Sequence, residues 1–308
     1  RAQMVQMHHA WHAVSTHNEC PPPVQKLLGE LVAATALLSA SLKFEGSLII
    51  QLQGDGPVQL LIAECNNTLG IRATLKMQEG AEVQSDASFK DMVNQTGKGL
   101  CVLILDPKNR QRGQQPYQGI VALDGDSVGQ ALEAYMRNSE QLETRLMLWS
   151  SNEAVAGILL QQMPKSGGKN LKNHDPNGWE TANILAETAK EEEMLTLDTE
   201  TMSRRLFLDM NPEVLADREP HFFCTCSRNK VSRMLINLGE KEVQEALKEH
   251  PHISVHCDFC NTAYLFTQNQ CEKLFSNDDD LDPPPEDIEP GQDPSGGVIR
   301  DGKPPTLH

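Results

Sequence analysis

The sequence lacks an apolar run long enough to cross a membrane. A spanning helix needs about 20 mostly apolar residues, and the most apolar helix candidate, residues 31–42, is interrupted by Thr35, Ser39 and Ser41. No secretory signal opens the chain either. The first residue is Arg1 and not Met, from which we expect a trimmed start. These absences predict a protein with no membrane partner.

Basic residues are also scarce. Lys and Arg number 27 against 43 Asp and Glu, a formal net charge of −16. Such a surface repels phosphate backbones, so nucleic acid is not an expected partner. The tail 277–308 holds nine of the acids, two of the bases and seven prolines. This composition cannot bury a core, and we expect a disordered acidic tail.

The chain has no disulfide framework of the kind that staples small secreted proteins. Four of its eight cysteines stand alone in varied contexts, namely Cys20, Cys65, Cys101 and Cys271. We interpret these four as small buried hydrophobes. Their pattern favours a reducing, cytoplasmic location. No Walker motif for nucleotide phosphates is present, which predicts an activity that does not use ATP.

What is present predicts an α+β fold whose N-terminal core domain spans 1–176. Apolar spacing predicts a helix from Pro22 or Pro23 to Leu42 and another over 126–138, capped by Asp126 or Ser127. Alternating, β-branched segments predict strands at 47–53, 101–105, 117–123, 145–150 and 156–163, and a hairpin of 58–65 with 68–75 that turns at Asn66-Asn67. We expect mixed helices and a largely antiparallel sheet.

A charged helical linker is predicted over 177–220. Residues 180–223 carry eleven acids against four bases and few apolar residues. Such a segment cannot form a core alone, so it must lie on the first domain or be marginally stable.

Four more cysteines stand in two close pairs within a predicted small domain, 221–276: Cys224-Thr-Cys226 and Cys257-Asp-Phe-Cys260. Two such pairs from separate segments are the usual supply for a tetrahedral zinc site with four cysteine ligands. We predict one Zn²⁺ held by these four residues. Short helices around Leu235 and Val243, separated by Gly239, and strands at 253–256 and 263–267 complete the module. His221, His250, His252 and His256 are weaker candidate ligands.

The residues alone leave open whether the thiols hold a permanent structural zinc, exchange disulfides or act as a switch. Structural zinc supplies roughly 10–16 kcal/mol of apparent folding energy in small peptides. If each pair closed on itself, the loops of three and four residues would contribute only about 1.5–2 kcal/mol per bridge. Oxidation is therefore expected to unfold the module, which makes a redox switch physically natural.

The thiol segments "FFCTCSRNKVSRML" and "HCDFCNTAYLF" resemble the zinc-binding end of the redox-regulated heat-shock chaperones of about thirty-three kilodaltons, the bacterial cytosolic holdases. "PVQKLLGELVAATALLSASLKFEGSLIIQLQGDGPVQLLIAECN", "YQGIVALDGDSVGQALEAYMRNSEQLETRL" and "KEEEMLTLDTETMSRRLF" resemble other signatures of that family. The resemblance covers about residues 1–275 and not the tail. The family's usual first residues are absent, from which we expect a lost edge strand or weaker strand pairing there.

The resemblance implies a mechanism. The reduced, zinc-bound protein is an inactive monomer. Oxidant with an unfolding stress forms disulfides Cys224–Cys226 and Cys257–Cys260, releases zinc and loosens the linker. The protein then dimerises and holds unfolding client proteins, without ATP and without being an enzyme. Two alternatives remain: a constitutive interaction protein with structural zinc, and a thiol–disulfide oxidoreductase, which would need Cys257 to open a helix in a βαβ setting.

Overall fold

The computed structural model of the chain describes residues 1–109, 115–163, 177–210 and 217–276. The chain divides into two compact units, Arg1–Phe223 and a second that begins at Cys224. The predicted acidic tail, 277–308, lies outside the described residues. Among the described residues, no helix combines the length and the apolar character needed to cross a membrane.

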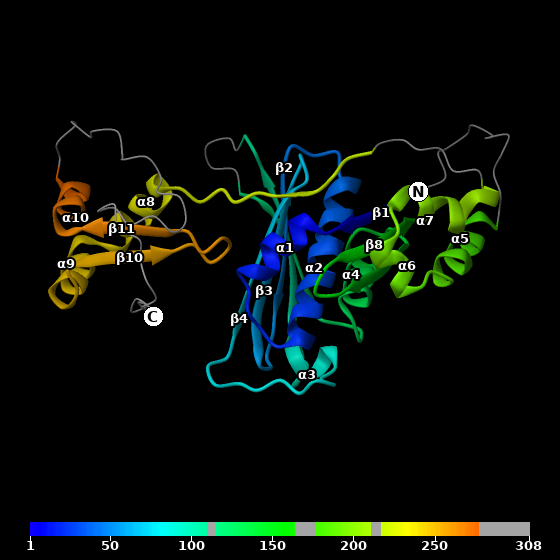
Figure 1. Ribbon diagram of the computed structural model, residues 1–308, viewed down its shortest axis with the longest axis horizontal. Helices are drawn as coiled ribbons and strands as arrows, with labels where there is room; N and C mark the ends of the chain where they lie inside the picture. Colours follow the sequence, from blue (N-terminus) through cyan, green and yellow to red (C-terminus); the bar gives the residue numbers. More distant parts are fainter. Residues whose placement is uncertain (110–114, 164–176, 211–216, 277–308) are drawn as a thin grey trace. The chain divides into compact units, whose positions relative to one another are not determined.

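A six-stranded sheet forms one layer of the first unit (Figure 1). Its strand order is β6-β5-β2-β3-β4-β9, and every pair except β4–β9 is antiparallel. The strands are β2 (Gly46–Gln53), β3 (Val58–Asn66), β4 (Gly70–Met77), β5 (Leu100–Pro107), β6 (Tyr117–Ala122) and β9 (His221–Phe222). The predicted antiparallel sheet and its hairpin are confirmed. The turn is set by Asn66, whose Oδ1 accepts from the backbone N–H groups of Thr68 and Gly70, both at 2.9 Å.

A second sheet has three strands in the order β1-β8-β7, all antiparallel. They are β1 (Ala2–Met7), β8 (Val155–Gln161) and β7 (Thr144–Ser150). Every residue of β8 is buried, as expected for a central strand covered on both faces. The edge strand β1 was not predicted; it begins at the second residue and pairs with β8 over six residues. An edge strand is therefore present at this end of the first unit, and the effect expected from the absent first residues stays a prediction.

The helix α2 (Pro22–Ser41) lies between the two sheets (Figure 1). It is buried nearly all round, because it packs on β3 with one side and on β7 and β8 with another. Gly29 permits this close approach: a Cβ there would lie 2.1 Å from Ser150 Oγ. The other helices before β7 are α1 (His9–Thr16), α3 (Phe89–Val93) and α4 (Val128–Ser139). Of the two predicted caps of α4, Ser127 is the one used, since its Oγ accepts from Gln130 N at 3.2 Å.

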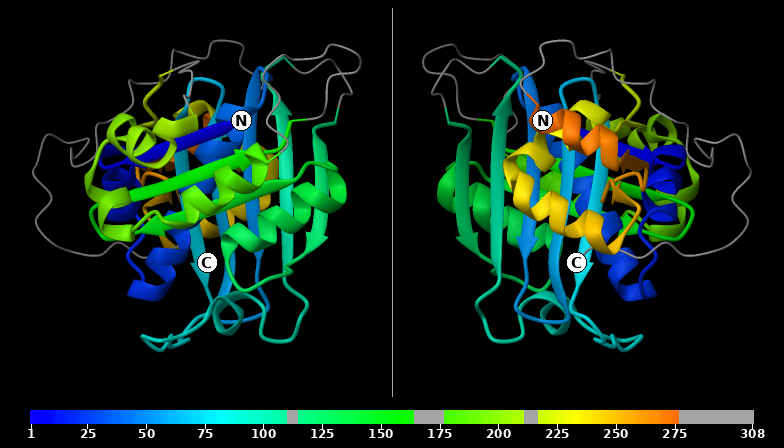
Figure 2. Two further views of the ribbon diagram at one scale, coloured as in Figure 1. Left: turned by 90° about the vertical axis from the view of Figure 1, so that its right-hand side faces the viewer. Right: turned by 90° about the vertical axis from the view of Figure 1, so that its left-hand side faces the viewer.

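The charged segment lies on the outer face of the three-stranded sheet (Figure 2, left). It contains α5 (Gly178–Glu187), α6 (Glu191–Thr196), α7 (Thr199–Phe207) and the 3-10 turn η1 (Leu208–Met210). An apolar cluster joins three β8 residues to this segment, and its buried members are Ala156, Ile158, Leu160, Ala186, Met194, Met202, Leu206 and Phe207. The segment thus packs its apolar residues against the sheet, because it could not form a core alone.

Polar contacts add to this apolar docking. The side chain of Gln6 on β1 donates to Met194 O at 3.1 Å. Arg145 on β7 lies 3.1 Å from Glu187 of α5 and 3.6 Å from the buried Glu133 of α4. These contacts tie α6 to β1 and α5 to β7 at separate points of the three-stranded sheet.

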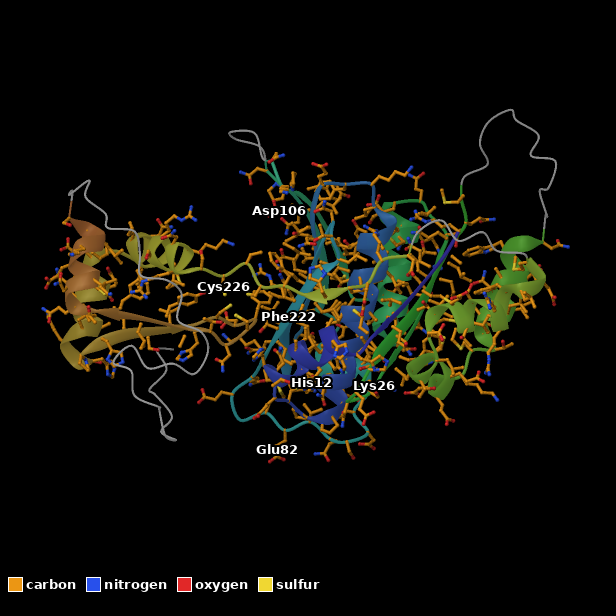
Figure 3. All side chains as sticks on the ribbon, turned by 45° about the horizontal axis from the view of Figure 1, so that its top comes forward. His12, Lys26, Glu82, Asp106, Phe222 and Cys226 are labelled. Carbon is orange, nitrogen blue, oxygen red and sulfur yellow. The ribbon has the colours of Figure 1, made fainter. Side chains whose placement is uncertain are left out.

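Strand β9 adds a parallel edge to β4, directly before the first paired cysteine. The His221 N–H donates to Leu69 O and the Phe223 N–H to Ile71 O, both at 3.0 Å. Phe222, labelled in Figure 3, is half-buried against the main core. The pairing fixes this part of the chain to the sheet edge.

The second unit is small and has its own core. Its elements are α8 (Arg228–Leu238), α9 (Glu240–Glu249), β10 (His252–His256), β11 (Ala263–Thr267) and α10 (Gln268–Phe275). Gly239, with φ 106°, separates the first two helices as predicted. Helix α10 was not predicted. The described parts of the chain therefore confirm an α+β fold with a small C-terminal cysteine module.

The four isolated cysteines are core residues for the most part. Cys65, Cys101 and Cys271 are at most 1 % exposed, and Cys20 is half-buried. Burial raises the pKa of Cys65 to about 11 and that of Cys101 to about 12, so these thiols stay protonated and unreactive. Their interpretation as small buried hydrophobes is confirmed for the three buried ones.

Glu30 on α2 is a half-buried residue whose carboxyl group has no hydrogen bond or ion pair in the described part of the chain. Its charged neighbours are Lys26, one turn earlier on α2 and labelled in Figure 3, and Glu191 at the start of α6. Burial raises the pKa of Glu30 to about 7; Lys26 opposes this rise and Glu191 adds to it. The unfolded chain releases this proton near pH 4.5, so it binds fewer protons than the folded chain up to about pH 7.

We therefore predict that the first unit loses stability as pH rises from about 5 to about 7, because the unfolded chain releases the Glu30 proton in this window while the folded chain still holds it. Urea unfolding of the full chain at a series of pH values measures this, and Glu30→Gln should reduce the slope in that window. Glu82→Gln, at an exposed position, is the matched control. An unchanged slope in Glu30→Gln would contradict the assignment.

Candidate metal centre

The two cysteine pairs converge in the second unit. The Sγ atoms of Cys224, Cys226, Cys257 and Cys260 all lie within 4.8 Å of one another, and all four residues are half-buried. In the described part of the chain, no other group of three or more His, Cys, Asp or Glu residues is placed to hold a metal ion. The histidines considered from the sequence, His221, His250, His252 and His256, do not join this group.

The second pair is held by the turn that joins β10 to β11. The Cys257 N–H donates to Thr262 O at 3.0 Å, and the Asn261 N–H donates back to Cys257 O at 2.8 Å. Asn261 closes this turn with φ 55°, a left-handed conformation that Asn tolerates better than most residues. The backbone N–H groups of Phe259 and Cys260 point at the Cys257 sulfur and favour its thiolate form. This pattern of amide donors suits a ligating sulfur.

The first pair lies on the segment that leads into α8, with Cys226 labelled in Figure 3. Ser227 caps the helix by accepting from Lys230 N at 3.4 Å, which fixes where the segment ends. The Lys230 side chain turns back and donates to Thr225 O, between the two cysteines, at 2.5 Å. Lys230 therefore brings a positive charge beside this pair.

Sulfur–sulfur distances test whether these residues fit a zinc ion. Cys224 Sγ lies 3.7 Å from Cys257 Sγ, and Cys226 Sγ lies 3.4 Å from Cys260 Sγ. A disulfide would need about 2.05 Å, so these are thiols. Four sulfurs at about 2.3 Å from a central ion form a tetrahedron with edges of about 3.8 Å. The four-thiol donor set therefore fits a tetrahedral zinc ion in both chemistry and spacing.

Without a cation, the crowded thiols resist ionisation. Contact with the Cys224 thiol, followed by burial, raises the pKa of Cys257. Burial also raises the pKa of Cys226 to about 11, although the Tyr264 hydroxyl opposes this rise. A bound divalent cation reverses such shifts, because a coordinating thiol is deprotonated outright.

Arg228 and Arg233 are two further basic residues that follow the first pair in the sequence. The Arg228 guanidinium lies 4.2 Å from the centre of the Phe266 ring and donates to Leu265 O at 2.8 Å. It also donates to Gln270 Oε1 at 3.0 Å. Arg228 thus fastens the start of α8 to β11 and α10, and Arg233 donates to Asn229 O of its own helix.

Two residues at the site were missed from the sequence. The Tyr264 hydroxyl donates to Cys226 Sγ at 3.1 Å, and Thr262 Oγ1 lies 3.1 Å from Cys260 Sγ. Both stand two residues apart along the chain that enters β11, so they share one face. The signal available in the sequence was the alternation of side chains after Cys260. In a strand that returns from the turn, every second side chain lies on the face of the sulfurs.

Comparisons with known proteins show which family this chain resembles. The family model described as Hsp33 protein matches residues 1–267. The chain is 40 % identical over 278 residues to the 33 kDa chaperonin of Chromobacterium violaceum, covering 90 % of each chain. It is 39 % identical over 279 residues to the 33 kDa chaperonin of Methylobacillus flagellatus, covering 90 % of this chain and 91 % of the relative.

A solved structure shares the fold. The crystal structure of the 33 kDa chaperonin (heat shock protein 33 homolog) from Thermotoga maritima matches with a TM-score of 0.71 at 19 % identity, over 89 % of this chain and 92 % of that one. The family match over most of the length, together with the converged cysteines, identifies the chain as a member of the Hsp33 family.

Proposed function

We propose that this protein is a redox-regulated, ATP-independent holdase chaperone. The observation that carries the proposal is the convergence of Cys224, Cys226, Cys257 and Cys260 in a small unit with a thin core. The relatives that match over nine-tenths of the chain are named chaperonins, which supports a chaperone role and not that of an enzyme.

In the inactive state the four cysteines hold one zinc ion. When bound, zinc keeps the sulfurs as thiolates and contributes folding energy, roughly 10–16 kcal/mol in small zinc-finger peptides. The protein's own residues position the sulfurs: the turn closed by Asn261 holds the second pair, and the contacts of Arg228 hold the segment of the first pair. The module 221–276 is then folded and the protein is monomeric.

Activation is oxidation by a peroxide. One sulfur of a pair attacks a peroxide oxygen, so that an S–O bond forms, the O–O bond breaks and hydroxide leaves to be protonated. The second sulfur then attacks the sulfenic sulfur, and water leaves as the S–S bond forms. Per pair, two thiolates lose two electrons, and one hydrogen peroxide takes up these electrons and two protons from the solvent to become two waters. The proposed bridges are Cys224–Cys226 and Cys257–Cys260.

These bridges stabilise less than the metal they replace. Each closes a loop of only three or four residues and contributes about 1.5–2 kcal/mol on the chain-entropy estimate. The small core around Leu235, Ile253 and Phe266 then loses its main support. We propose that module 221–276 unfolds and that the neighbouring linker, 177–220, loosens from the N-terminal core domain, 1–176.

Release of the linker would uncover apolar surface of the first unit. The described helices α5–α7 cover Ala156, Ile158 and Leu160 of β8 with Met202 and Phe207, among others. Freed from one another, both surfaces are apolar and suit unfolding client proteins, whose exposed residues are apolar as well. The activated protein is proposed to act as a homodimer in the cytoplasm, with neither nucleic acid nor membrane as a partner.

Cys257→Ser and Cys260→Ser should each lower zinc content, because three sulfurs leave the site incomplete, and should give partial holdase activity without oxidant. Zinc content and suppression of light scattering by an unfolding client measure the two effects. Cys20→Ser, at the half-buried isolated cysteine, is the control and should match the wild type. Variants that remain fully zinc-loaded and inactive would show that the ligand assignment is wrong.

Limited proteolysis tests the extent of unfolding. After peroxide treatment at elevated temperature, we predict rapid cleavage beyond residue 221 and survival of a fragment that covers most of 1–170. The reason is that the first unit keeps its own core, which includes Leu28, Leu31 and Ile50, whereas the second depends on its metal. Equal resistance along the whole oxidised chain would contradict the switch and favour a constitutive structural-zinc protein.

A further inference from the structure

We propose that Thr262 and Tyr264 are positioning residues that set how tightly the cysteine cluster retains its metal and how fast its sulfurs react with peroxide. The inference rests on the proposed function and adds to it two named residues outside the ligand set. It concerns the threshold of the switch, which the four cysteines by themselves do not determine.

The geometry assigns one hydroxyl to one sulfur of each pair. The Tyr264 hydroxyl lies 3.1 Å from Cys226 Sγ and donates to it. Thr262 Oγ1 lies 3.1 Å from Cys260 Sγ. Because a metal-bound thiolate has no proton to give, Thr262 must be the donor whenever the site is loaded. The two sulfurs so contacted are themselves 3.4 Å apart.

Both hydroxyl groups are held in place by the strand pairing. Tyr264 is 5 % exposed, belongs to the small core and pairs with Val255 across the β10–β11 hairpin. Thr262 accepts the Cys257 N–H through its backbone O at 3.0 Å. Phe266, two residues beyond Tyr264, lies under the Arg228 guanidinium. One face of this strand thus aims a hydroxyl at Cys260, a hydroxyl at Cys226 and a ring at the residue that anchors α8.

Hydrogen bonds to ligating sulfurs have two consequences that act in the same direction. They spread the negative charge of a four-thiolate site, and residues of this kind commonly contribute about 10–100-fold to metal affinity. They also withdraw electron density from the sulfur lone pairs that attack peroxide. Nucleophilicity falls with sulfur basicity with a slope of about 0.4–0.5, so a tenfold loss of basicity corresponds to about threefold slower attack. Each hydroxyl therefore favours the reduced, metal-loaded state of the cysteine cluster.

The roles of the two hydroxyl groups are tested in the full-length, zinc-loaded protein with the variants Tyr264→Phe and Thr262→Val. These variants keep the aromatic ring and the branched side chain but remove the hydroxyl groups. Zinc transfer to a chromogenic chelator should become about tenfold more favourable, and zinc release by excess peroxide about threefold faster. Loading with Co²⁺ gives a readout that a merely structural role would not move. The thiolate-to-cobalt absorption should shift to longer wavelength, because the sulfurs become better electron donors.

Two controls separate the hydroxyl groups from other effects. Thr262→Ser keeps a hydroxyl and should behave as the wild type. Tyr117→Phe removes a tyrosine hydroxyl from the first unit, where it lies 3.4 Å from Glu140 Oε1, and should leave zinc retention unchanged. Thr262→Val is close to isosteric at a half-buried position, so it tests the inference even if Tyr264→Phe lowers stability.

The outcomes are distinct. Faster release and a shifted cobalt absorption in Tyr264→Phe and Thr262→Val, with both controls unchanged, would support the inference. Wild-type zinc affinity, release rate and cobalt spectrum in both variants would overturn it while leaving the proposed function intact. A wild-type protein that binds no zinc, or retains it under peroxide, would instead overturn the proposed function and this inference together.

Discussion

The convergence of four cysteine sulfurs within 4.8 Å is the constraint on which the rest of the account depends. Thiols packed this closely, in a half-buried setting, are costly to ionise without a cation, as the raised pKa of Cys257 shows. In the function we propose, a bound metal removes that cost and becomes the main source of stability for a unit whose buried apolar residues are few. In the proposed switch the same sulfurs are the nucleophiles that react with the oxidant, so stability and redox sensitivity would depend on the same atoms.

In the proposed function, the linker helices are the part of the first unit that responds to oxidation of the cysteines. The charged helices α5–α7 have no core of their own and share one with β8 through Met194, Met202 and Phe207. The described part of the segment that leads from them towards the cysteines pairs with the edge of the large sheet at Gly70 and Ile71, through β9. This segment is held only by a core that it shares with β8 and by a strand of two residues. We therefore expect it to be the first part of the first unit to loosen.

Much of this could be predicted from the sequence, because the strongest signals are local. The spacing of the cysteines predicted the cluster, the apolar period predicted α2, and the order Asp126-Ser127 placed the start of α4 to within one residue. Contacts between distant parts could not be predicted. Strand β9 is only two residues long and pairs with β4, which lies far earlier in the chain. Helix α10 is short and has one fully buried residue, Cys271. The sulfur contacts of Thr262 and Tyr264 depend on the register of the β10–β11 hairpin, which one strand's sequence does not fix.

Hydrogen exchange on the oxidised, zinc-free protein tests the central claim most directly. The amides of β10 and β11 report on the second unit, and those of β2 and β3 provide a reference in the core of the first. The account predicts that oxidation with loss of zinc abolishes protection in β10 and β11 while β2 and β3 remain protected. Protection of β10 and β11 that equals the reduced, zinc-loaded level would contradict it, because the module would then be stable on its short disulfides alone.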